Sequence, residues 1–150
     1  YRRWQDLVQR GVTRQGLVRF HTVHKYLLLA HSVPHYRQLG RLVAQVNEYR
    51  PKDLAIRYGE LFMQALAAKA TVRKHVNVLQ HILGHFKERL DAQEKAELLG
   101  VIADYHQGLT PLIVPLTLIK HYVQLFAVAY IREQVYLNPH PKELVLRNHV

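Results

Sequence analysis

The chain has 150 residues, of which 49% are apolar, so it is long enough for one compact domain with a full hydrophobic core and too apolar to be disordered. It contains no cysteine, which excludes disulfides, zinc–thiolate sites, iron–sulfur ligation and thiol nucleophiles within these residues and is compatible with a cytoplasmic location. Its formal net charge of +10 points to a polyanionic partner.

The positive charge is concentrated in the first part of the chain. Residues 1–87 carry fifteen Lys and Arg against four Asp and Glu, whereas residues 88–150 carry six against seven. No acidic residue lies between Leu7 and Asn47. Like charges held together cost stability, and a phosphate backbone would relieve that cost, so RNA or DNA is the first partner to consider.

The first half of the chain is predicted to be helical, because capping residues, prolines and glycines recur where helices begin and end. The expected helices are the end of a helix over 1–10 closed by Gly11, a helix from the cap Thr13 to about His31, one from the cap Ser32 to about Asn47 with Pro34 in its first turn, and one opened by Pro51 and Asp53 that runs to Ala68 or Lys69.

The second half continues the pattern. The expected elements are a helix from the cap Thr71 to about Arg89, one opened by the capping-box pair Asp91 and Glu94 and ended by Gly108, an apolar helix from Thr110-Pro111, a helix over roughly 128–136, and a break at Asn138-Pro139-His140-Pro141 before a short terminal segment. No alternating strand pattern is present. About seven helices predict an all-α, bundle-like single domain over residues 1–150, and the start inside a helix suggests a fragment of a longer chain.

The most apolar run, Leu109 to Ile119, is too short and too often interrupted for a membrane span. We therefore expect a buried core helix there and no membrane partner.

The helix expected over 72–87 has two contrasting faces. Placing residues at 100° intervals puts Val72, Val76, Leu79, Leu83 and Phe86 on one stripe, which should face the core. The opposite face has no acid and consists of Arg73, Lys74, Asn77, Gln80, His81, His85 and Lys87. Cations suit phosphates, and amides suit base edges or sugar hydroxyls, so this face is a candidate RNA contact surface. An ordinary solvated face is the alternative.

Three histidines share the apolar stripe of the helix expected over 14–31: His21, His24 and His31. They are either core histidines that bridge neighbouring helices, or the lining of a polar pocket for a small ligand. A metal site is the least favoured interpretation, because the carboxylate or thiolate groups that usually complete one are scarce. We predict no metal in this chain.

The helix expected over 111–126 has a narrow polar strip that includes Lys120 and His121. Lys120 either extends outward to water or reaches a phosphate. No paired carboxylates, phosphate-binding loop or nucleophile motif is present, and Ser32 beside His31 is better explained as a helix cap. The sequence therefore predicts no catalytic residues and leaves open whether the chain has an activity.

Several long motifs resemble the YbgA family of bacterial proteins, across essentially the whole chain. They are FHTVHKYLLLAHS at 20–32, YRQLG at 36–40, KHVNVLQHILGHF at 74–86, GLTPLIVPL at 108–116, KHY at 120–122 and QVYLNPHP at 134–141. The family has long been a domain of unknown function. It occurs alone or C-terminal to a domain that resembles the TudS thiouracil desulfidase, an iron–sulfur enzyme.

The resemblance implies an accessory domain that binds tRNA or another RNA for a 4-thiouridine tRNA desulfidase. Any iron–sulfur cluster would lie in the fused or partner domain, since this chain needs no cofactor of its own. The implied RNA contacts are Lys25, Arg37, Arg41, Lys74, Asn77, His81 and Lys120, to which the helix face adds Arg73, Gln80 and His85. The possible pocket residues are His21, His24, His31, His75 and His121, which could equally be core groups. A domain that docks on a partner enzyme, or a small-ligand site, remains the alternative function.

Overall fold

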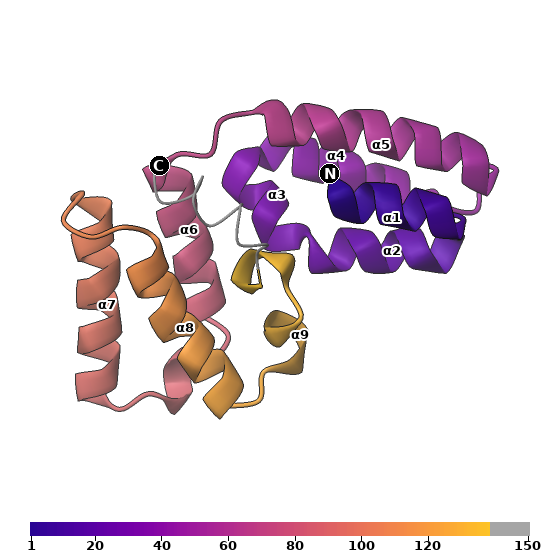
Figure 1. Ribbon diagram of the computed structural model, residues 1–150. Helices are drawn as coiled ribbons and strands as arrows, with labels where there is room; N and C mark the ends of the chain where they lie inside the picture. The colour runs from indigo at the N-terminus through magenta and orange to yellow at the C-terminus, as the bar shows by residue number, and fades with distance from the viewer. Residues whose placement is uncertain (139–150) are drawn as a thin grey trace. The chain divides into compact units, whose positions relative to one another are not determined.

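The computed structural model describes residues 1–138, and throughout this range the chain forms helices and no strand (Figure 1). The all-α prediction is therefore confirmed. The chain divides into two compact units, residues 1–69 and the residues from 70 onward. Whether the two act as the one domain expected from the sequence stays a prediction.

Five helices form the first unit (Figure 1): α1 Arg2–Arg10, α2 Arg14–Val23, α3 Lys25–His31, α4 Val33–Ala44 and α5 Pro51–Ala67. Helix α4 packs on α2, α3 and α5, and α3 also contacts α5. Their apolar faces enclose a core that includes Leu17, Leu28, Leu39, Tyr58 and Phe62. Helix α1 buries a single side chain, Trp4, which lies against the rings of Phe20, Tyr58 and Phe62.

The predicted caps of this unit are present. The side chain of Thr13 accepts a hydrogen bond from the backbone N–H of Gly16 (2.9 Å), and Ser32 accepts one from His35 (3.3 Å). Gly11 ends α1 with a φ of 90°, a conformation that costs little without a Cβ. The starts of α2 and α4 were therefore predicted correctly from their capping residues.

The expectation of one continuous helix over 14–31 is wrong, because the chain turns at His24 between α2 and α3. The ring of His24 stacks on Phe20 at 3.9 Å between centroids, and its Nδ1–H donates to the Phe20 carbonyl oxygen at 2.7 Å. A side chain that bonds its own preceding turn competes with the helical backbone. The apolar pattern continues through the turn and gave no sign of it.

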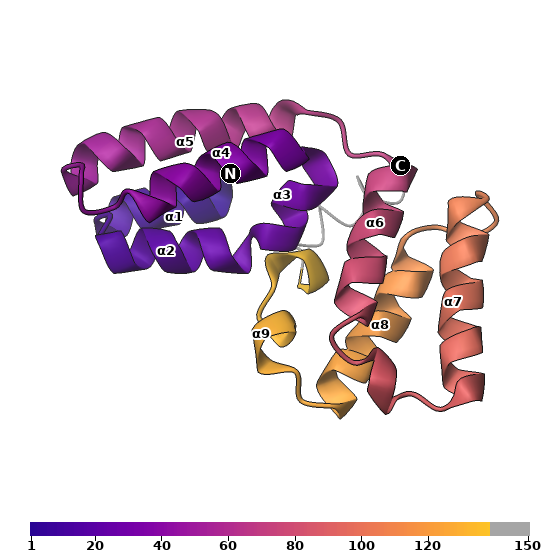
Figure 2. The same ribbon diagram turned by 180° about the vertical axis from the view of Figure 1, so that it is seen from behind.

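The second unit contains α6 Val72–Leu83, α7 Ala92–His106, α8 Ile113–Leu125, the short α9 Ala129–Arg132, and two 3₁₀ turns, η1 Lys87–Arg89 and η2 Val135–Leu137. Helices α6, α7 and α8 pack against one another, as Figure 2 shows from behind. Asp91 and Glu94 form the predicted capping box at the start of α7, and Gly108, with a φ of 79°, follows its end.

Two predicted boundaries in this unit are wrong. The helix expected to reach Arg89 ends at Leu83, after which two backbone bonds span only three residues and turn Phe86 into the core. The helix expected over 128–136 is interrupted at Gln134, which is extended and fully buried. Such breaks raise the helix count of residues 1–138 above the expected seven. The break predicted at Asn138 to Pro141 lies outside the described residues from Pro139 on.

No helix between residues 1 and 138 combines the length and the apolar character that a bilayer crossing demands.

Candidate nucleic-acid interface

Helix α6 begins at a defined cap and buries one face. Thr71 accepts a hydrogen bond from the backbone N–H of Lys74 at 3.2 Å, which fixes the first turn. The predicted stripe faces the core, since Val76, Leu79 and Leu83 are buried. The buried face is wider than expected and also includes His75, Val78 and Ile82.

The opposite face of α6 is open to solvent. Lys74 is half-buried on this side, and the helix contains no acidic residue at all. The exposed members are Arg73, Asn77, Gln80 and His81, followed just beyond the helix by His85. Six of the seven residues that the sequence assigned to this face thus lie together on one helix and the turn after it, and the seventh, Lys87, is exposed in η1.

The backbone adds to this positive charge. A helix N-terminus carries a partial positive charge that acidic residues of the first turn usually offset. No acid occupies the first turn of α6, where Arg73 and Lys74 lie instead. The first turns of α1, α2, α3 and α4 also lack acids, and α2 and α3 begin with Arg14 and Lys25. Bound anions would therefore stabilise these ends.

In the first unit, Arg37 and Arg41 lie one turn apart on α4 and both are exposed. Neither forms an ion pair with any residue in the described range 1–138. Lys25 on α3 is half-buried, with its Nζ 5.4 Å from the ring centroid of Tyr26.

The sequence interpretation missed Arg57. Arg41 and Arg57 both line a shallow cleft of about 450 Å³ between α4 and α5, together with Gln38, Gln45, Gln64 and Glu60. Placing the α5 sequence on a helical wheel puts Arg57, Glu60 and Gln64 on one side of the helix. The helical wheel could not show that Arg57 and Arg41 line the same cleft, because their proximity depends on how α5 packs against α4.

Two other arginines have structural partners. Arg14 donates to the carbonyl oxygens of Val46 and Tyr49, at 2.7 and 2.9 Å, and so ties α2 to the segment after α4. Arg89 donates to the Phe126 carbonyl oxygen at 2.7 Å. These two cations hold loops in place, in contrast to Arg37 and Arg41.

On α8 the polar strip is where the sequence placed it. Lys120 is half-buried and His121 is exposed, so His121 lies at the surface. Pro115 lies in the first turn of α8, where its missing N–H costs no helical hydrogen bond.

The histidines of the first unit are bonded within its core. Nδ1 of His21 lies 2.9 Å from the Tyr58 hydroxyl, and its ring stacks on Tyr36 at 5.1 Å. Burial lowers the pKa of His21 to about 4, which keeps the ring neutral near pH 7. His24 donates to its own preceding turn, and half-buried His31 donates from Nδ1 to the Ala68 carbonyl oxygen at 2.8 Å.

In the second unit, Nδ1 of buried His75 lies 2.6 Å from the Tyr136 hydroxyl. The histidines therefore bridge elements, which favours the core interpretation over the pocket. Ser32 caps α4 and lies 2.7 Å from Nδ1 of His35. Within residues 1–138, no three His, Asp or Glu side chains come close enough together to hold a metal ion.

These features define a class: a helical protein with basic helix faces that lack carboxylates, and with the histidines of its core in structural roles. The chain matches the family described as "Protein of unknown function (DUF1722)" over residues 25–141, and it belongs to that family. It is 36% identical over 143 residues to the "Uncharacterized protein YbgA" of Escherichia coli (strain K12), covering 95% of this chain and 85% of the relative. No solved structure matches it. The resemblance to the YbgA family is thereby confirmed.

Proposed function

We propose that this chain is an RNA-binding accessory domain and that the exposed face of α6 contacts the RNA. The observation that carries the proposal is the composition of that face, where Arg73 and Lys74 lie beside Asn77 and Gln80 with no carboxylate in the helix. Cations bind phosphates and amides bind base edges or 2′-hydroxyls, so the face offers both kinds of contact that RNA needs.

The charge of the whole chain supports the same partner. A net charge of +10 draws a polyanion toward the protein, and Arg37 and Arg41 offer a second basic cluster on α4. The family resemblance suggests a tRNA substrate and a 4-thiouridine desulfidase, fused or separate, as the enzyme served. That enzyme would supply the iron–sulfur chemistry, because this chain has no cysteine.

The test compares two charge-matched double variants. Arg73→Gln with Lys74→Gln removes two cations from the α6 face, while Lys95→Gln with Arg132→Gln removes two from other helices of the same unit. Binding of a fluorescent tRNA is followed by anisotropy over a range of salt concentrations. Each phosphate contact contributes about 0.7–0.9 to the steepness of a plot of log affinity against log salt concentration. Loss of two contacts in the Arg73→Gln, Lys74→Gln variant should therefore reduce this steepness by about 1.5.

The proposal fails if wild-type protein does not bind tRNA at low salt. It also fails if the two double variants weaken binding equally, because the effect would then reflect net charge and not the α6 face. A third variant, Arg37→Gln with Arg41→Gln, measures whether the α4 cluster takes part.

A further inference from the structure

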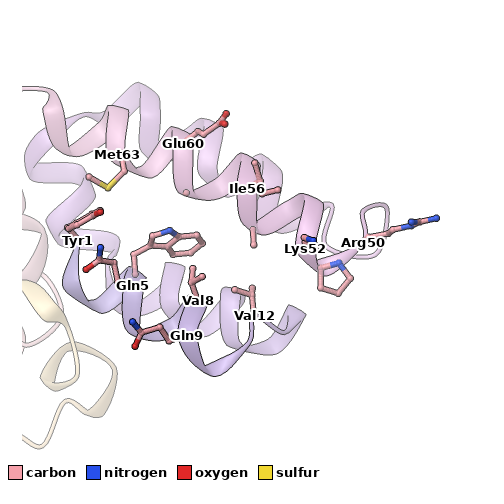
Figure 3. A pocket seen from close by; sticks show the side chains of 14 residues that line it. Tyr1, Gln5, Val8, Gln9, Val12, Arg50, Lys52, Ile56, Glu60 and Met63 are labelled. Atoms are coloured by element: carbon pink, nitrogen blue, oxygen red, sulfur yellow. The ribbon is translucent and has the colours of Figure 1, made fainter.

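A mostly apolar groove of about 1130 Å³ lies between α1 and α5 in the first unit (Figure 3). The two helices run antiparallel along it. Tyr1 and Met63 lie near one end, and Val12, Arg50 and Lys52 lie near the other, with Val8 on α1 and Ile56 on α5 at intermediate positions along the groove.

One face of α1, continued by Val12 beyond its end, forms the first wall of the groove, and one face of α5 forms the second. Residues of the first wall recur at the helical spacing i, i+3, i+4, i+7 and i+8, as Tyr1, Trp4, Gln5, Val8 and Gln9. The second wall lies wholly within α5 and extends this spacing to i+11, with Lys52, Ala55, Ile56, Gly59, Glu60 and Met63. Eleven helical steps cover about 16 Å, or three turns. The groove is therefore as long as a three-turn helix.

The surface of the groove is mostly apolar, although the exposed side chains of its walls also include Gln5, Gln9, Lys52 and Glu60. The side chains of Val8 and Ile56 are 49% and 54% exposed, and those of Tyr1 and Met63 are also exposed. The floor is closed by Trp4, whose ring lies so close to Gly59 that a Cβ there would be 2.8 Å from it. A mostly apolar groove with a packed floor and exposed apolar side chains on both walls is what an amphipathic helix covers in helix-in-groove recognition.

The charges around the groove indicate which kind of partner could bind there. Arg50 and Lys52 lie at the end where α5 begins, and the positive end of the helix dipole adds to their charge. Glu60 is the one carboxylate among the lining residues, and in Figure 3 its side chain points away from α1. Residues 1–69 carry twelve Lys and Arg against four Asp and Glu, so a second copy of this chain would be repelled.

We infer that the α1–α5 groove binds an amphipathic helix of a partner protein, with acidic residues at the end that reaches Arg50 and Lys52. The apolar side chains of that helix, spaced i, i+3, i+4 and i+7, pack on Val8, Ile56 and Trp4. The inference is independent of RNA binding, because none of the groove residues belongs to the α6 face or to the Arg37–Arg41 cluster.

The experiment displays a library of helix-forming peptides of about 14 residues, with apolar residues fixed at the spacing above and free residues elsewhere. The library is selected on the full chain and counter-selected on Ile56→Glu, a change at an exposed position that should leave the fold intact. Trp4 is the only tryptophan and lies in the groove, so its fluorescence follows binding of the selected peptide directly.

The selected peptides should carry Asp or Glu toward one end and bind at least about tenfold more weakly to Ile56→Glu and to Arg50→Gln with Lys52→Gln. Leu125→Glu, at an apolar position that is 60% exposed on α8, is the matched control and should bind normally. Circular dichroism confirms that each variant is folded. The tRNA affinity of Ile56→Glu should equal that of wild type.

Three results would overturn the inference. One is a selection that yields no peptide whose binding depends on Ile56. A second is equal binding by peptides in which lysine replaces the acidic residues. The third is a wild-type dimer in sedimentation that Ile56→Glu dissociates, since the groove would then be an interface between copies of this chain.

Discussion

No side chain fits at Gly59, because the Trp4 indole occupies the space where its Cβ would lie. An added Cβ would meet three ring atoms of Trp4 at 2.8 to 2.9 Å, and the ring is held by Tyr58 and Phe62 on its other sides. Trp4 is the sole buried residue of α1, so displacing its ring would loosen the whole helix.

We therefore expect Gly59→Ala to lower the free energy of unfolding by about 1–3 kcal/mol, because overpacking outweighs the gain in helix propensity. Gly100→Ala is the matched control. Gly100 lies in α7 with no atom within 4 Å of its would-be Cβ, so this change should stabilise by about 0.5–1 kcal/mol. Urea denaturation followed by circular dichroism measures both. Stabilisation by Gly59→Ala would contradict the packing seen at Trp4.

His21 gives the fold a dependence on pH. Its pKa is lowered by burial from the ordinary 6.5 to about 4. As the pH falls from 6.5 toward 4, the unfolded chain takes up a proton that the folded chain does not, so the free energy of unfolding decreases in this window. His21→Gln cannot titrate and should flatten this part of the profile. Urea midpoints at several pH values test it, and an unchanged slope would show that other groups dominate.

At the scale of helices, the starts of α2, α4, α6 and α7 could be predicted because each depends on one cap close to it in the sequence. The breaks after Val23 and Leu83 could not, because the first depends on the rotamer of one histidine and the second on packing in the core, and neither is visible in the apolar spacing. His24 turns the chain by stacking on Phe20, and Phe86 leaves the helix to enter the core. The apolar spacing of both segments is compatible with an unbroken helix.

The capping box of α7 can be tested directly. Asp91 accepts from the backbone N–H of Glu94 at 2.7 Å, and the Glu94 carboxylate accepts from that of Asp91 at 2.9 Å. We expect Asp91→Ala to cost about 1 kcal/mol in thermal or urea unfolding. Glu97→Ala removes the same charge from an exposed position later in α7 and should cost less than about 0.5 kcal/mol. Equal effects would mean that charge, not capping, matters.

The candidate site shows the same division between local and tertiary information. The α6 face could be predicted almost completely, because one helix carries it and helical periodicity determines which residues share a side. The α4–α5 cleft and the α1–α5 groove could not be predicted, since each forms between two helices. The same limit made His21 and His31 look like parts of one pocket, although their hydrogen bonds lead to Tyr58 and to Ala68.

For the molecule as a whole, the net charge of +10 should oppose folding at low ionic strength. We expect the melting temperature to rise when sodium chloride increases from about 0.05 M to about 0.3 M, because salt screens the repulsion. Arg37→Gln with Arg41→Gln lowers the charge and should reduce the rise. A melting temperature that is independent of salt would show that the positive charges lie too far apart to interact.

The position of Trp4 also determines which part of the chain tryptophan fluorescence reports on during thermal unfolding. The only indole of the chain sits in the core of residues 1–69, so its emission reports the loss of that unit alone, whereas helical ellipticity sums both units. Two coincident curves would mean a single cooperative transition over the whole chain. If the fluorescence transition instead occurs at a lower or higher temperature than the ellipticity transition, the two units unfold separately, each with its own stability.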